Sequence, residues 1–225
     1  MISQNSQENP RGAASSSQLR RRFLPAWALM AVAATVLGGC QLIPTASPDT
    51  TRFYVLSGPA LVEPAVAKAG GRLQIGLRAV DMPAYLRATK SIVVRSGSNE
   101  IRYQDYSRWA EPLDAGVSRI LKDRLMATPE VAGVTAHPMR GDVARNYDVA
   151  VRILHCEGVA GENPVARFAA SYEIIAADDS GKVVLRRTFN APDATWDGKD
   201  FSKLAASLGE GVAALCAEIA ANLPK

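Results

Sequence analysis

Histidine and cysteine are scarce in this chain, which has two histidines and three cysteines among 225 residues. Neither His137 nor His155 is accompanied by other ligands at the spacing of a zinc site. The nucleophile-elbow, phosphate-loop, CxxC and HExxH motifs are also absent from the sequence. These absences argue against the common hydrolases, nucleotide-binding proteins and metal-dependent enzymes. We therefore predict no catalytic residue, no metal and no cofactor.

Long hydrophobic runs are equally scarce, and the longest stands near the start of the chain. "FLPAWALMAVAATVL" (23–37) has about 15 residues, fewer than the ~20 that a membrane-spanning helix needs. Three arginines (20–22) precede it and two glycines (38–39) follow it. This order is typical of a removable export signal, which we predict over residues 1–39. "RRRFL" also resembles a twin-arginine motif, so the choice of export route stays open.

Cys40 follows this signal directly. "LGGC" resembles the bacterial lipobox, in which the signal is cut between the small residue, here Gly39, and a cysteine that becomes acylated. Each buried methylene of an acyl chain contributes about 0.8 kcal/mol, so two or three chains give stable anchoring. The next residue is Gln41 and not aspartate, which by the same resemblance implies transfer to the outer membrane. The alternative is an unmodified cysteine buried after an apolar helix.

Neither sign of charge dominates the part of the chain that remains after cleavage. The formal net charge of the whole chain is +4, but the leader carries most of it through four arginines (Arg11 and 20–22) against Glu8. About +1 remains for the mature protein. A nucleic-acid-binding domain usually carries a marked basic excess, so we predict no nucleic-acid partner.

The mature chain begins with a segment of low complexity. Residues 40–51 are rich in Pro, Ser and Thr and show no hydrophobic periodicity, so we predict a lipid-bearing N-terminus and a flexible tether. Residues 52–225 are predicted to form a single domain. Alternating or β-rich runs predict strands near 52–56, 72–80, 91–95, 100–104, 131–137, 147–159, 165–178 and 183–189, with hairpin turns at "SGSN" and "DDSGK".

Two amphipathic helices are predicted from apolar stripes at helical spacing. One begins at Pro112 and has the stripe Leu113, Val117, Ile120, Leu121 and Leu125. The other spans about 200–223 and has the stripe Leu204, Leu208, Val212, Leu215, Ile219 and Leu223. The order of strands, helix, strands and helix indicates an α+β fold, with a mixed, largely antiparallel sheet covered on one face by two helices.

Three segments carry a resemblance to a known family: "FYVL" (53–56), the long run from "LRAVDMPAYL" to "ILKDRL" (77–125), and "LAASLGEGVAALCAEIAANL" (204–223). Together they resemble the PqiC/YmbA family of auxiliary lipoproteins of ABC-type transport systems linked to membrane integrity. "RWAEPL" (108–113) is the most specific part. The resemblance implies a non-enzymatic lipoprotein on the inner leaflet of the outer membrane, facing the periplasm. It also implies partnership with a mammalian-cell-entry-domain protein and its ABC permease and ATPase.

Four residues are candidates for contact with a partner or with another copy of the chain: Tyr85, Arg108, Trp109 and Glu111. Packing of these aromatic side chains in the core is the alternative. Two other function classes stay open at this point. One is a lipoprotein of outer-membrane assembly or polysaccharide export, and the other is an enzyme acting on lipid or peptidoglycan.

Cys156 and Cys216 are the two thiols that remain after lipidation of Cys40. An even pair in an oxidising periplasm is a candidate disulfide. Two separate buried thiols are the alternative, because sequence spacing does not fix the geometry that a disulfide requires.

Overall fold

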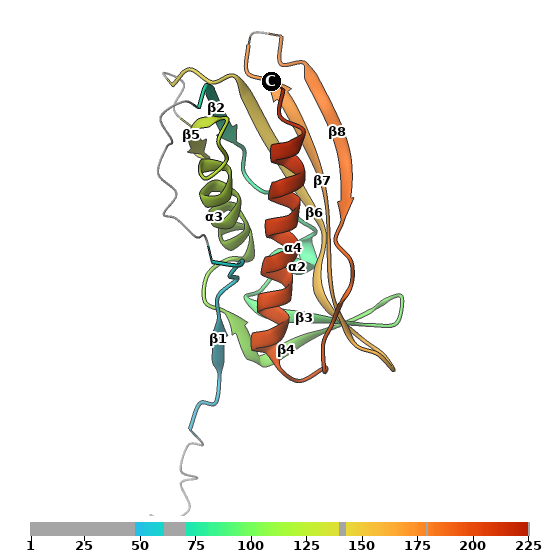
Figure 1. The fold of residues 1–225 in the computed structure, drawn as a ribbon. Coiled ribbons are helices and arrows are strands. Elements are labelled where there is room, and N and C mark those ends of the chain that lie inside the picture. Colours follow the sequence, from blue (N-terminus) through green and yellow to red (C-terminus); the bar gives the residue numbers. More distant parts are fainter. Residues whose placement is uncertain (1–47, 61–70, 140–142, 179, 225) are drawn as a thin grey trace, which may run out of the picture. The chain divides into compact units, whose positions relative to one another are not determined.

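The structure is a computed structural model that describes residues 48–60, 71–139, 143–178 and 180–224 (Figure 1). The predicted signal (1–39) and the predicted lipidation site Cys40 lie outside the described residues. The strands are β1 (Arg52–Tyr54), β2 (Leu73–Leu77), β3 (Ser91–Ser96), β4 (Glu100–Trp109), β5 (Val131–Ala136), β6 (Tyr147–Ala160), β7 (Val165–Ala176), β8 (Val183–Asn190) and β9 (Ala194–Thr195). The helices are α2 (Ala84–Arg87), α3 (Leu113–Met126) and α4 (Phe201–Ala221).

Strand β6 is the central strand of the sheet. Along one edge it forms an antiparallel ladder with β7 that extends from Tyr147 to Val159 of β6. Its other edge pairs in parallel with β2 at residues 147–149 and with β3 at residues 158–160. The sheet therefore divides beside β6, so that β2 leads to β5 while β3 leads to β4 and β1. The longest ladders are antiparallel, and the predicted mixed, largely antiparallel sheet is confirmed.

Helices α3 and α4 both pack on one face of this sheet (Figure 1). Every residue of the two predicted apolar stripes is buried. Burial of one such side chain contributes about 1.5–3 kcal/mol, so these stripes are the main attachment of the helices to the sheet. By length and composition alone α4 would qualify as a membrane span, but its leucines are buried inside the domain, as in the core helix of a folded protein.

The start of the domain is fixed to α4 by close contacts. The ring of Tyr54 in β1 packs on Phe201 with 6.3 Å between ring centroids, and Phe201 packs on Trp196 at 5.5 Å. Further along, a Cβ atom on Gly209 would clash with the carbonyl oxygen of Ser57. Only glycine permits this approach of the chain to the helix. The segment that follows the predicted tether is thus an integral part of the core.

Two local features differ from the prediction. The region 72–80 was expected to alternate between buried and exposed residues, but β2 is shorter and Gly76 is buried together with its two neighbours. The reason is that Arg145 and Asp148 lie directly over Gly76, so this side of β2 is covered as well. The short helix α2 after Pro83 was not predicted, because four residues are too few to show a helical period.

Strand β4 contains an irregularity that changes which side chains are exposed. Ser91 of β3 pairs with Arg108, whereas Val93 pairs with Tyr103, so Ile92 alone stands opposite four residues of β4 (104–107). Bulges of this kind bend a strand and redirect its side chains. Tyr103 and Tyr106 are both exposed although they are three residues apart.

Candidate interaction surfaces

The structure separates the four predicted contact residues. Trp109 is only 3% exposed, and its backbone N–H donates to the carbonyl oxygen of Lys90. It is part of the core cluster and offers no surface to a partner. The prediction of Trp109 as a contact residue is therefore wrong. Its side chain lies on the inward side of β4, so the ring is packed in the core and not directed towards solvent.

Glu111 is occupied within the domain. Its carboxylate accepts a hydrogen bond from the guanidinium of Arg119 at 2.5 Å, and the same Arg119 nitrogen donates to the carbonyl oxygen of Leu56 at 3.0 Å. Gly116 of α3 lies against this carboxylate. Glu111 thus joins α3 to the segment after β1, which is a structural role that the sequence did not reveal.

Arg108 is exposed and lies on β4, between β3 and the edge strand β1. Its Nε atom donates to the carbonyl oxygen of Asp105 at 3.2 Å. In the parallel pairing of β1 and β4, Arg108 is directly opposite Phe53. Phe53 and Tyr106 are 64% and 63% exposed, and Val55 after β1 is half exposed. We call Phe53, Val55, Tyr106 and Arg108 the β1–β4 patch.

Tyr85 belongs to a different group of side chains. The guanidinium of Arg95 lies over its ring at 5.5 Å from the centroid, and Arg95 donates to the Tyr85 hydroxyl at 3.3 Å. The hydroxyl of Tyr103 donates to the backbone carbonyl oxygen of Tyr85 at 3.3 Å. The pKa of Tyr85 is raised to about 12. Burial of the hydroxyl is the main cause, and the negative charge of Glu157 is the second. Tyr85, Arg95 and Tyr103 form what we call the Tyr85 cluster.

Glu157 holds the Tyr85 cluster in place. This carboxylate is completely buried, and it accepts a hydrogen bond from the Nε atom of Arg95 at 2.7 Å. Nδ1 of His155 lies 3.1 Å from the same carboxylate oxygen. A buried carboxylate requires such partners, because an unpaired charge in the interior is strongly unfavourable. In the sequence Glu157 stands in a long strand that also contains Asp148, Arg152 and His155, so nothing there marked it as the buried one.

These pairs lie on the face of the sheet opposite α3 and α4. Phe168 and Gly158 face α4, since a Cβ on Gly211 would meet Phe168 and a Cβ on Gly158 would meet Leu204. Neighbouring residues of a strand point to opposite faces, so Glu157 points away from the helices. Two further carboxylates on this side each hold two arginines: Asp148 with Arg78 and Arg145, and Asp81 with Arg87 and Arg152.

The two thiols are separate. Cys156 and Cys216 are both free and buried, and Cys216 lies 3.7 Å from the carbonyl oxygen of Leu121 in α3. Cys156 is on β6 in register with Phe168. Burial raises the pKa of both thiols to about 12. Of the two alternatives left open by the sequence, the structure has two separate buried thiols, since Cys216 is directed at α3 while Cys156 belongs to the sheet.

Within the described ranges, no group of three or more His, Cys, Asp or Glu side chains is placed to hold a metal ion. His155 is paired with Glu157, and His137 follows β5 and precedes a cis peptide bond to Pro138. The thiols are buried with raised pKa values, which disfavours the reactive thiolate form. The arrangement provides exposed aromatic and arginine side chains for binding.

The chain belongs to the family of ABC-type transport auxiliary lipoprotein components, whose model matches residues 54–220. Its fold is similar to that of protein XCC0632 from Xanthomonas campestris, with a TM-score of 0.57 at 17% identity, covering 74% of this chain and 91% of that one. A second crystal structure, of an uncharacterized protein, also gives a TM-score of 0.57 at 17% identity and covers 76% of this chain and 99% of that one. No curated protein matches the chain.

Proposed function

We propose that this protein is the outer-membrane docking subunit of a mammalian-cell-entry-type ABC lipid-transport system. In this proposal residues 1–39 are removed, Cys40 carries the acyl chains, and residues 40–51 tether the domain of residues 52–225 to the membrane. The domain faces the periplasm from the inner leaflet. It receives the far end of a conduit that is anchored in the inner membrane, so that lipid crosses the periplasm without contact with water.

The observation that carries the proposal is the family of transport auxiliary lipoproteins, matched over residues 54–220, on a chain whose leader ends in "LGGC". The geometry adds support for a role in binding. Two of the chain's carboxylates are engaged within the domain: Glu157 holds Arg95 and His155, and Glu111 holds Arg119. They stabilise the fold and leave aromatic and arginine side chains at the surface.

We assign partner contact to the Tyr85 cluster. Tyrosine and arginine are, with tryptophan, the residues enriched among those that dominate binding energy at protein interfaces. Tyr103 is 39% exposed, so it is accessible to a partner. Its hydroxyl and the guanidinium of Arg95 are both fixed by hydrogen bonds within the domain. Such preorganised side chains lose little conformational entropy when a partner binds. Of the four residues predicted from the sequence, Tyr85 is the one that belongs to this cluster.

The test is co-purification from crosslinked envelopes. We expect the wild-type lipoprotein to capture a mammalian-cell-entry-domain protein, and Tyr103→Ser to lose this partner while remaining folded. Val184→Ser is the matched control, because Val184 is also an exposed apolar residue but lies on β8. It should retain the partner. Deletion of the gene should leave cells sensitive to detergent.

Two results would count against the proposal. Retention of the partner by Tyr103→Ser would reject the Tyr85 cluster as the contact surface. Failure of the wild-type protein to capture any transport component, with capture of assembly or polysaccharide-export machinery in its place, would reject the transport function itself.

A further inference from the structure

The β1–β4 patch is the largest concentration of exposed apolar side chains in the described part of the domain. The described part of the domain has six exposed large hydrophobic residues. Three of them, Phe53, Val55 and Tyr106, belong to this patch. The register of β1 and β4 places Phe53 beside Arg108, two residues from Tyr106 on the same strand. Trp109 is buried in the core and Tyr54 packs against it, so the alternation of the strands brings the exposed side chains to the other side.

The position of the patch in the chain indicates what covers it. Strand β1 begins at residue 52, directly after the predicted tether. Residues 41–51 of the tether separate Cys40 from this strand. A flexible segment of this length has an end-to-end distance of only about 18 Å. Helix α4, with 21 residues, is about 32 Å long, so the domain extends well beyond the reach of a relaxed tether. The end of the domain that carries β1 is therefore the end held nearest to the acyl chains.

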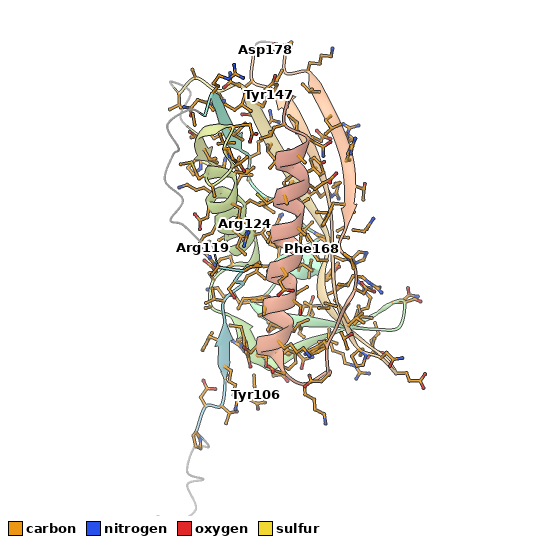
Figure 2. All side chains as sticks on the ribbon, in the orientation of Figure 1. Tyr106, Arg119, Arg124, Tyr147, Phe168 and Asp178 are labelled. Atoms are coloured by element: carbon orange, nitrogen blue, oxygen red, sulfur yellow. The ribbon has the colours of Figure 1, made fainter. Side chains whose placement is uncertain are left out.

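Figure 2 shows Tyr106 at this end, where the described chain also begins, and Asp178 of the β7–β8 turn at the opposite end. Aromatic side chains with a polar group favour the headgroup level of a bilayer, and arginine flanks such positions with its charge in water. In the sequence Arg52 and Arg108 each stand three residues after an aspartate, Asp49 and Asp105, so these four residues together carry no net charge. Balanced charges favour insertion driven by apolar contact over attraction to anionic lipid.

From these observations we infer that the β1–β4 patch inserts its side chains into the interfacial region of the bilayer to which the protein is anchored. This inference rests on the lipid anchor of the proposed function. The patch would orient the domain on the membrane, with the β1 end against the lipid and the β7–β8 turn directed away from it. Contact of the patch with a protein partner is the competing outcome.

The experiment uses the full lipidated protein in phosphatidylcholine vesicles whose acyl chains carry bromine close to the headgroups. Phe53→Trp and Tyr106→Trp place a fluorophore on the patch, and Val184→Trp places one on β8 as a matched exposed control. The two native tryptophans of the domain, Trp109 and Trp196, are buried and supply a common background, which the wild-type protein measures. Circular dichroism verifies the fold of each variant.

We expect bromine to quench the added fluorescence of Phe53→Trp and Tyr106→Trp, equally at low and high salt, and to leave Val184→Trp unchanged. Absence of quenching at both patch positions, or equal quenching at all three, would overturn the inference. A spectral change at the patch only upon addition of the purified partner would do the same and assign the patch to protein contact. Intact mass separates the two proposals, since an unmodified Cys40 contradicts the anchor, whereas acylated protein without quenching contradicts only the insertion.

Discussion

The two faces of the sheet are stabilised by different means. On the covered face, leucine, valine and isoleucine stripes of α3 and α4 pack against the apolar side of β6 and β7. On the opposite face, carboxylates of β6 and its neighbours hold arginines, and one of them, Glu157, is fully buried. Apolar packing on the covered face can tolerate limited changes in side-chain shape. The side-chain arrangement on the opposite face depends on matched charges. The comparison indicates that the helix face gives the domain its stability and that the opposite face positions side chains for binding.

The largest expected effect concerns thiol reactivity on the covered face. Cys156 and Cys216 are buried with pKa values raised to about 12, so both should be unreactive towards a thiol reagent in the folded protein at neutral pH. Both should react completely after unfolding without a reductant. Reaction of neither thiol after unfolding, with reaction after addition of a reductant, would show that a disulfide joins them.

Truncation of the α4 stripe should give the largest loss of stability. Leu208 is fully buried against the sheet, and Leu208→Ala should cost about 2–5 kcal/mol of unfolding free energy through lost burial and the remaining cavity. Urea denaturation measures this value. Ala206→Ser, on the exposed side of the same helix, is the control and should be nearly neutral. Equal effects of the two changes would contradict the assigned helix face.

Removal of one partner of the buried charge pair should come next. Arg95→Ala leaves Glu157 buried with His155 alone, and the cost should be about 3 kcal/mol, at the low end for buried pairs because Arg95 is partly exposed to water. Replacement of both residues, Arg95→Met with Glu157→Gln, should restore part of the loss. A double-mutant cycle with no coupling would show that the pair does not act as a unit.

The cap of α4 should have a smaller effect. The Asp200 carboxylate accepts hydrogen bonds from the backbone N–H groups of Ser202 and Lys203 at 2.9 and 3.1 Å. Asp200→Ala should lower the unfolding free energy by about 1 kcal/mol. Asp200→Asn retains the acceptor and should lose little. If Asn is as unfavourable as Ala, the hydrogen bonds are not the cause.

The smallest effect is expected for an exposed ion pair on the same face as Glu157. Arg186 of β8 pairs with Glu173 at 2.6 Å, but its side chain is mostly exposed. Arg186→Ala should change the unfolding free energy by no more than about 0.5 kcal/mol. A loss similar to that of Arg95→Ala would mean that burial is not what distinguishes the two pairs.

The sequence predicted the parts of the fold that repeat a pattern. The stripes of α3 and α4 and the hairpins β3–β4 and β7–β8 could be read from their periodicity and turn residues. The division of the sheet beside β6 could not, because parallel pairing with both β2 and β3 depends on contacts distant in sequence. The same limit applies to the candidate contacts. Only the structure shows that Trp109 points inward, that Glu111 is held by Arg119, and that Tyr85 meets Arg95 and Tyr103.

The central claim is that this lipoprotein receives a transport conduit through the Tyr85 cluster. The most direct measurement is photo-crosslinking in living cells, with a photoreactive phenylalanine analogue in place of Tyr103 and, as control, in place of Val184. The account predicts a covalent adduct with a mammalian-cell-entry-domain protein from position 103 and none from position 184. Adducts from position 103 with other envelope machinery alone, or identical adducts from both positions, would contradict it.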